Sequence, residues 1–169
     1  MGGKDSIIID KDLHNFDDAV AGVLSSAFGF SGQKCSACSR VIVHEKIYDK
    51  FCDALAEQVK SINVGETVDN PKMGPVINKK SKDSILSYIQ KGVDEGGTII
   101  AGGKEIESKG YFVEPTIIKN VSPKDTIAQE EIFGPVLAVI KSSGFDDSLD
   151  IANNTMFGLT GAVYSKNPK

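Results

Sequence analysis

Continuous apolar runs rich in β-branched residues alternate along this chain with segments of helical hydrophobic periodicity. The clearest runs are residues 6–9, 40–44 and 136–140. Successive β-branched residues favour a buried strand. Strands that are apolar on both faces and are separated by helices are typical of a parallel sheet with helices on both sides. The sequence therefore predicts an α/β fold: a three-layer domain with a largely parallel sheet covered by helices.

The connecting segments give the remaining elements. Apolar residues recur at helical spacing in residues 16–28 and 48–62. Asn78 is suited to cap a third helix, which we expect to stop at Gly96. Pro115 cannot donate to a strand ladder, so we expect an edge or irregular segment there. Further elements are predicted as strands at 98–101 and 159–164 and a short helix at 148–153.

Composition excludes several classes of protein. The chain has 169 residues, of which 40% are hydrophobic and 25% charged, as in an ordinary globular domain. Its net charge of −4 argues against nucleic acid as a partner, because such binding needs a basic face. No apolar run approaches the roughly 20 residues of a membrane span. For this reason we expect no membrane partner. Three cysteines are too few for a disulfide scaffold, so we expect a cytoplasmic protein.

Cys35 lies where a helical segment turns into a strand, beside Ser36. A thiol at such a corner is placed to attack a ligand bound above the sheet, provided that its pKa is lowered. Backbone N–H groups of the turn are suited to stabilise an oxyanion. The alternative is that Cys35 is a small buried hydrophobic residue, which is common for a free cysteine. Local sequence leaves both interpretations open.

Cys38 forms a C-x-x-C pair with Cys35 and raises the possibility of a dithiol or metal site. A zinc site needs further soft ligands. Cys52, the remaining thiol, falls on the apolar face of its own helix. A thioredoxin-like pair precedes a helix, whereas a strand follows this one. We therefore expect Cys38 and Cys52 to be structural and no metal to be bound.

A second motif precedes the strand at 136–140 and contains Glu131, Phe133 and a Gly-Pro turn. One interpretation is a solvated loop with one hydrophobic anchor. The other is a ligand site, in which a carboxylate accepts hydrogen bonds from ligand hydroxyls while Phe133 packs on a flat ring. The motif alone does not decide between them.

Together the motifs resemble those of one enzyme family. Residues 32–35, Gly-Gln-Lys-Cys, resemble the active-site G-Q-x-C of the NAD(P)-dependent aldehyde dehydrogenases, and residues 131–135 resemble their E-I-F-G-P. Residues 2–4 are similar to the end of the family's E-x-G-G-K, and residues 153–159 carry another family signature. The resemblance covers the whole chain in order. The amino-acid sequence of residues 27–40 most resembles those of the branch that oxidises glutamate semialdehyde, whose cyclic form is 1-pyrroline-5-carboxylate.

The resemblance implies roles for four residues. Cys35 would be the nucleophile that forms a thiohemiacetal and then a thioester, with its own N–H as an oxyanion donor. Glu131 would bind the hydroxyls of the nicotinamide ribose, and Phe133 would pack near the nicotinamide. Ser36 would help to hold the substrate carboxylate. The implied cofactor is NAD, the substrate a small aldehyde, and the parent enzyme a homo-oligomer.

The same resemblance implies that residues 1–169 are part of a catalytic domain. The family's general base precedes its G-G-K, and its Rossmann-type cofactor domain and its anchor and oligomerisation segments would lie outside this sequence. We therefore expect the isolated chain to be inactive and to bind NAD weakly or not at all. The alternative is a non-catalytic structural or interaction module, and NAD binding by the chain would distinguish the two.

Overall fold

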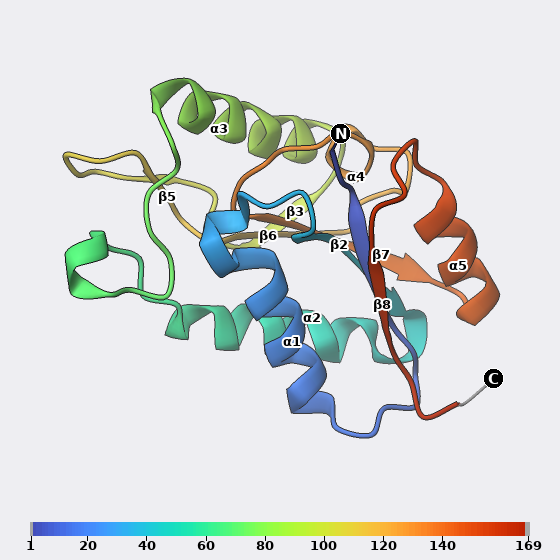
Figure 1. Cartoon of the computed structure of the whole chain (residues 1–169). Helices are drawn as coiled ribbons and strands as arrows, with labels where there is room; N and C mark the ends of the chain where they lie inside the picture. Colours follow the sequence, from blue (N-terminus) through green and yellow to red (C-terminus); the bar gives the residue numbers. More distant parts are fainter. Residues whose placement is uncertain (1, 168–169) are drawn as a thin grey trace.

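The structure is a computed structural model that describes residues 2–167. Its main feature is a six-stranded sheet of order β3-β6-β7-β2-β1-β8 (Figure 1). Neighbouring strands are parallel, except that β3 is antiparallel to β6. The prediction of a largely parallel α/β sheet is therefore confirmed. The strands are β1 (Asp5–Ile9), β2 (Cys38–His44), β3 (Thr98–Ala101), β6 (Thr116–Lys119), β7 (Val136–Ser142) and β8 (Gly161–Tyr164).

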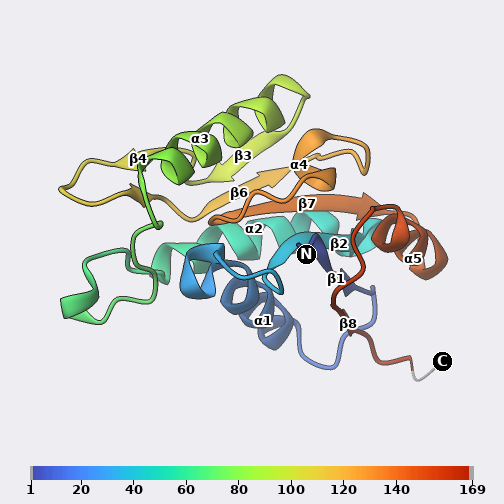
Figure 2. The same cartoon turned by 45° about the horizontal axis from the view of Figure 1, so that its top comes forward.

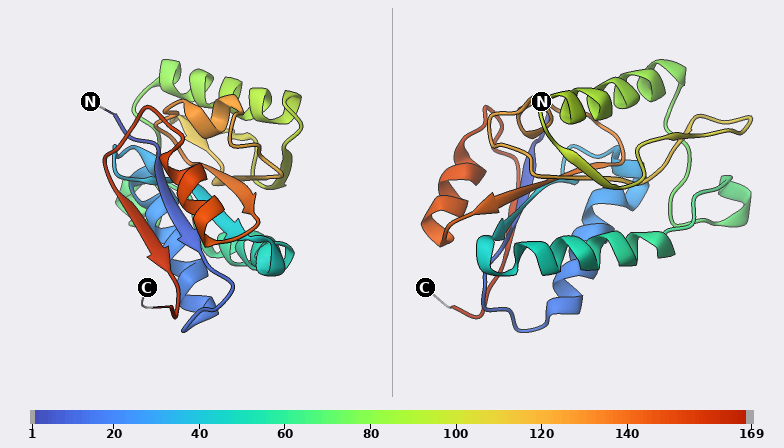
Figure 3. Two further views of the ribbon diagram at one scale, coloured as in Figure 1. Left: turned by 90° about the vertical axis from the view of Figure 1, so that its right-hand side faces the viewer. Right: turned by 180° about the vertical axis from the view of Figure 1, so that it is seen from behind.

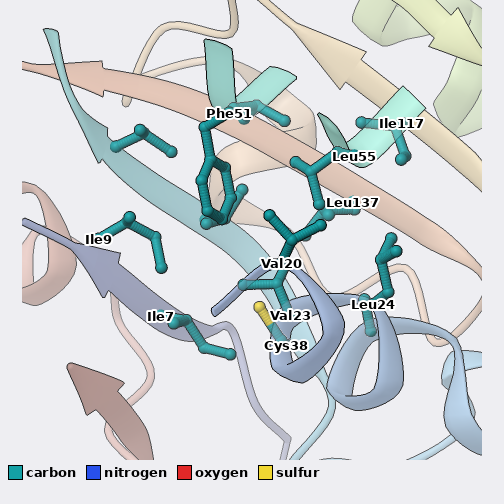
Figure 4. Close-up of a cluster of buried hydrophobic side chains, with 14 of the residues drawn as sticks. Ile7, Ile9, Val20, Val23, Leu24, Cys38, Phe51, Leu55, Ile117 and Leu137 are labelled. Carbon is teal, nitrogen blue, oxygen red and sulfur yellow. The ribbon is translucent and has the colours of Figure 1, made fainter. Parts of the chain in front are cut away.

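Helices cover both faces of the sheet, as predicted. On one face lie α1 (Phe16–Phe28) and α2 (Tyr48–Gln58), and on the other lie α3 (Lys79–Asp94), α4 (Thr126–Gln129) and α5 (Phe145–Asn153) (Figure 2). Successive strand residues point to opposite faces. Ile7 and Ile9 therefore pack in the core under α1 and α2, shown in Figure 4, whereas Ile8 packs in the core under α5.

One helix start agrees with the expected cap, and two other helix boundaries differ from the prediction. Asn78 caps α3, since its side-chain oxygen accepts a hydrogen bond from the Ser81 N–H at 2.8 Å. The second helix ends earlier than predicted, because a 3₁₀ turn, Val59–Ser61, follows Gln58. The last helix starts earlier than predicted, at Phe145. The short α4 was not predicted.

The expectation of an edge or irregular segment around Pro115 is confirmed for residues 112–115, but the interior strand that follows them was not predicted. Phe112–Val113 (β5) does pair only with Glu105–Ile106 (β4) in a small separate sheet. Immediately after the proline, however, β6 runs in the interior of the main sheet between β3 and β7. A proline removes only its own N–H. The ladder therefore resumes at once, with Thr116 N–H donating to the Pro135 carbonyl oxygen at 2.9 Å.

The sheet ends at β8, which lies beside β1 at one edge (Figure 3, left). This strand is shorter than predicted, because Thr160 N–H donates to Asp5 Oδ1 at 2.9 Å and takes no part in the ladder. Gly161, Ala162 and Val163 are exposed. Within residues 2–167, none of the helices has both the length and the apolar character needed to cross a membrane.

Candidate active site

The loop that leads from α1 to Cys35 has an unusual backbone. Phe30, Ser31 and Gly32 follow one another with φ values of 58°, 56° and 66°. Left-handed backbone costs roughly 1–2 kcal/mol per residue for L-amino acids other than glycine. Such strain persists where surrounding contacts hold it. One of these contacts is a hydrogen bond from the Ser31 hydroxyl to the Gly74 carbonyl oxygen at 2.8 Å.

Gln33 provides the second hold on this loop. Its side-chain oxygen accepts from the Ile77 N–H at 2.8 Å, and its side-chain nitrogen donates to the Pro75 carbonyl oxygen at 3.4 Å. The glutamine of the Gly-Gln-Lys-Cys motif therefore ties the cysteine loop to residues 74–77. No local pattern indicates these partners, because they lie more than 40 positions further along the chain.

Cys35 and Ser36 are both exposed on the turn beyond Gln33, where Ala37 N–H donates to the Lys34 carbonyl oxygen at 3.1 Å. The alternative that Cys35 is a buried hydrophobic residue is therefore excluded. Among residues 2–167 no acceptor takes the backbone N–H of Cys35. The turn thus presents a thiol, a hydroxyl and an unused N–H side by side.

The other two thiols are buried. Cys38 Sγ donates to the Arg40 carbonyl oxygen at 3.4 Å, and its side chain lies among Ile7 and Val23 in the core (Figure 4). Burial raises the pKa of Cys38 to about 12 and that of Cys52 to about 11. Both are thus poor nucleophiles at neutral pH. The part of the chain that the structure describes contains no group of three or more His, Cys, Asp or Glu side chains able to hold a metal.

The second motif presents one carboxylate and one aromatic ring. Glu131 is half-buried, and its Oε1 accepts from the Gly3 N–H at 2.9 Å. Phe133 has a left-handed φ of 56°, and 46% of the residue is exposed. A bulky residue in this conformation is an outlier, and such strain clusters at functional sites. Here the strained backbone holds an aromatic ring in solvent instead of in the core.

Backbone contacts bring the three motifs together. A Cβ on Gly32 would lie 2.2 Å from the Gly134 carbonyl oxygen, and one on Gly3 would lie 1.9 Å from the Cys35 carbonyl oxygen. Gly3 thus contacts the cysteine turn with its α carbon and Glu131 with its N–H. A cavity of about 20 Å³ between these segments has room for about one water molecule.

Comparison with known proteins identifies the family. The model of the aldehyde dehydrogenase family matches residues 1–169. The chain belongs to the aldehyde dehydrogenase family.

Individual aldehyde dehydrogenases resemble this chain over only part of their own length. A 1-pyrroline-5-carboxylate dehydrogenase from Staphylococcus aureus is 52% identical over 167 residues, which are 99% of this chain and 32% of that protein. The solved structure of 1-pyrroline-5-carboxylate dehydrogenase from Thermus with bound NAD has a TM-score of 0.96 and 46% identity over 99% of this chain and 32% of its own. Proline utilization A from Bdellovibrio bacteriovorus has a TM-score of 0.92 and 46% identity, over 98% of this chain and 17% of its own.

Proposed function

We propose that this chain is part of the catalytic domain of an NAD-dependent aldehyde dehydrogenase that oxidises glutamate semialdehyde (1-pyrroline-5-carboxylate) to glutamate. The observation that carries the proposal is the packing of the exposed Cys35 turn against Gly3, together with the Gly32 contact to the loop that holds Glu131 and Phe133. The printed names of the Staphylococcus aureus and Thermus relatives support this substrate. On this proposal the cofactor domain and the anchor and oligomerisation segments belong to other parts of a longer, homo-oligomeric, cytoplasmic protein.

Cys35 carries the covalent chemistry in this proposal. Its thiolate adds to the aldehyde carbon, and the electron pair of the C=O bond moves to oxygen. The backbone N–H of Cys35 donates to this oxyanion, which is a role for its unused hydrogen. Ser36 is exposed beside the thiol, and its hydroxyl donates a hydrogen bond to the carboxylate of the substrate. After oxidation, the acyl group is a thioester on Cys35, and water releases the acid and returns the thiol.

Two residues of the second motif fit NAD. Glu131 uses Oε1 internally and keeps Oε2 as an acceptor for ribose hydroxyls, while the Phe133 ring is exposed for packing beside a flat ring. When bound, NAD supplies the hydride acceptor that the protein side chains lack. The chain contributes alignment, because the backbone contacts of Gly3 and Gly32 bring the turn that carries Cys35 and the loop that carries Glu131 and Phe133 together.

Turnover by the protein that contains this sequence tests the proposal. We expect NADH formation from 1-pyrroline-5-carboxylate and its loss in C35S and C35A. In S36A we expect a raised KM, because a substrate contact is removed. Ser87→Ala, which changes an exposed serine on α3, is the control and should leave kcat and KM unchanged. Full turnover by C35A would overturn the assigned nucleophile, and absence of turnover by the unaltered protein would overturn the substrate.

The isolated 169 residues provide a separate test. We expect no turnover and weak or no NAD binding from them, measured by calorimetry, since most of the cofactor site is proposed to lie elsewhere. The alternative of a non-catalytic module would be favoured if the protein that contains this sequence also failed to bind NAD. Rapid turnover by the isolated chain would contradict the proposed division into domains.

A further inference from the structure

The chain contains a single arginine, Arg40, and only 1% of this residue is exposed. A buried charge is costly unless hydrogen bonds satisfy it. The guanidinium of Arg40 donates to three carbonyl oxygens: Nε to that of Lys4 at 3.1 Å, Nη1 to that of Ile151 at 3.2 Å and Nη2 to that of Ala152 at 2.9 Å. This buried side chain therefore joins two segments of backbone that are far apart in the sequence.

Two of the three acceptors belong to the last turn of α5. The last carbonyl groups of a helix have no partner within the helix, and its C-terminal end favours a cation. Arg40 reaches them from β2, because it lies opposite Ser6 in the strand register and Ile42, two residues further, packs in the core under α5. The guanidinium therefore ties the end of α5 to the sheet.

The third acceptor lies in residues 2–4, the segment that precedes β1. The pairing of β1 with β2 shifts register near its start, and such an irregularity locally disrupts a strand ladder. The contact with Arg40 therefore holds the segment at the point where the ladder is irregular. One residue before Lys4, the N–H of Gly3 donates to Glu131 Oε1 at 2.9 Å.

Residues 2 and 3 lie against both oxygens of the Glu131 carboxylate. The N–H of Gly3 binds Oε1, and a Cβ on Gly2 would lie 2.7 Å from Oε2 and 3.1 Å from the ring of Phe157. The α carbon of Gly3 also packs against the carbonyl oxygen of Cys35. A shift of this segment would therefore move the carboxylate relative to the cysteine turn.

We propose that Arg40 is a positioning residue for the Glu131 carboxylate, and that it acts by fixing residues 2–4 against the end of α5. This inference rests on the proposed function, in which Glu131 binds the ribose hydroxyls of NAD. Arg40 itself is buried, so its effect passes through Gly3. A lysine would carry the same charge, but its donors share one nitrogen and cannot span the three carbonyl oxygens.

A double-mutant cycle in the protein that contains this sequence tests the proposal, with the Kd for NAD measured by calorimetry. We expect Arg40→Lys to weaken NAD binding at least about fivefold in the unaltered background and less than about twofold in Glu131→Ala, because residues that act through one another are not additive. An equal loss in both backgrounds would overturn the proposal. If Glu131→Ala alone leaves the Kd unchanged, the proposed cofactor role of Glu131 is wrong, and hydrogen exchange then decides the role of Arg40.

The matched control is Tyr48→Phe. It removes a buried hydroxyl that donates to the Val139 carbonyl oxygen at 3.2 Å and accepts from the Asn120 N–H at 2.8 Å, but has no hydrogen bond to residues 2–4. We expect Tyr48→Phe to lower the free energy of unfolding and to leave the Kd for NAD unchanged. A loss of NAD binding as large as that of Arg40→Lys would show that any buried defect has this effect, and would overturn the proposal.

Hydrogen exchange provides a readout that does not depend on NAD. In Arg40→Lys we expect the Gly3 amide to exchange at least about tenfold faster, whereas the Ile77 amide, held by Gln33, should change only with global stability. An unchanged Gly3 amide would overturn the proposal. Arg40→Gln is the second variant, with the same expectation. If neither variant folds, NMR of the unaltered protein decides, and an Arg40 Nε–H without protection from exchange would overturn the proposal.

Discussion

The α carbon of Gly32 lies so close to the carbonyl oxygen of Gly134 that a Cβ at position 32 would be 2.2 Å from it. This contact joins the loop before Cys35 to the loop that carries Glu131 and Phe133, although the two glycines are far apart in the sequence. Gly32 also has a φ of 66°, which glycine adopts without strain. Both the conformation and the approach therefore require glycine at this position.

Replacing this glycine should destabilise the fold. We expect Gly32→Ala to lower the free energy of unfolding by at least about 2 kcal/mol, from left-handed strain plus a backbone collision. Gly144→Ala is the matched control, because its φ is −179° and no atom lies within 4 Å of a Cβ there. Urea denaturation measures both. Equal stability of the two variants would show that the loops separate easily.

Loss of the Gln33 side chain should loosen the cysteine loop. We expect Gln33→Ala to cost about 1–2 kcal/mol, because the Ile77 N–H and the Pro75 carbonyl lose their partner. Hydrogen exchange of the Ile77 amide should become faster, whereas amides of the central strand β7 should change only by the loss of global stability. Unchanged exchange at Ile77 would contradict the role given to Gln33. Gln90→Ala, which removes an exposed side chain that donates to Asp94 on the same helix, is the control.

The three thiols should react at very different rates. We expect iodoacetamide to label Cys35 first at neutral pH, because it is exposed while Cys38 and Cys52 are buried with raised pKa values. Peptide mapping by mass spectrometry after increasing times gives the order. In urea all three should react alike. Early labelling of Cys52 in the folded chain would contradict its place in the core.

Lys4 should make stability rise with pH. Burial, followed by the charge of Arg40, lowers the pKa of Lys4 from 10.5 to about 7 in the folded chain. Between these two pH values the unfolded chain keeps the proton on Lys4 and the folded chain releases it, so raising the pH favours folding. The slope from this one proton is at most about 1.4 kcal/mol per pH unit. It is best measured between about pH 7 and 9, since unfolded cysteines ionise near 9.0 and act in the opposite direction. Below about pH 7 both states hold the proton and this contribution to the slope disappears.

Two lysine variants separate the contribution of Lys4 to this pH dependence from that of other groups. Lys4→Met should remove the rise in stability between about pH 7 and 9, whereas Lys11→Met, at an exposed position, should retain it. Urea denaturation at several pH values gives the slopes. The burial of Lys4 would be contradicted by a slope that survives in Lys4→Met.

Much of the fold could be predicted from local pattern. The apolar runs of β1, β2 and β7, the α1 periodicity and the Asn78 cap are properties of neighbouring residues, and the structure confirms them. The interior strand β6 was missed because Pro115 directly precedes it, and a four-residue strand has too few positions to outweigh that signal. Local sequence does not decide the exposure of Cys35, because it fits a buried thiol equally well.

The sequence by itself determined the α/β class, the Asn78 cap and the family motifs, because each depends on patterns that neighbouring residues carry. Only the tertiary structure decided how the motifs meet. Gly3 lies between Cys35 and Glu131, Gln33 reaches residues 74–77, and Lys4 is buried without a partner. These relationships join positions that are distant in the chain, and they exist only because packing of the sheet and helices brings those backbones into contact.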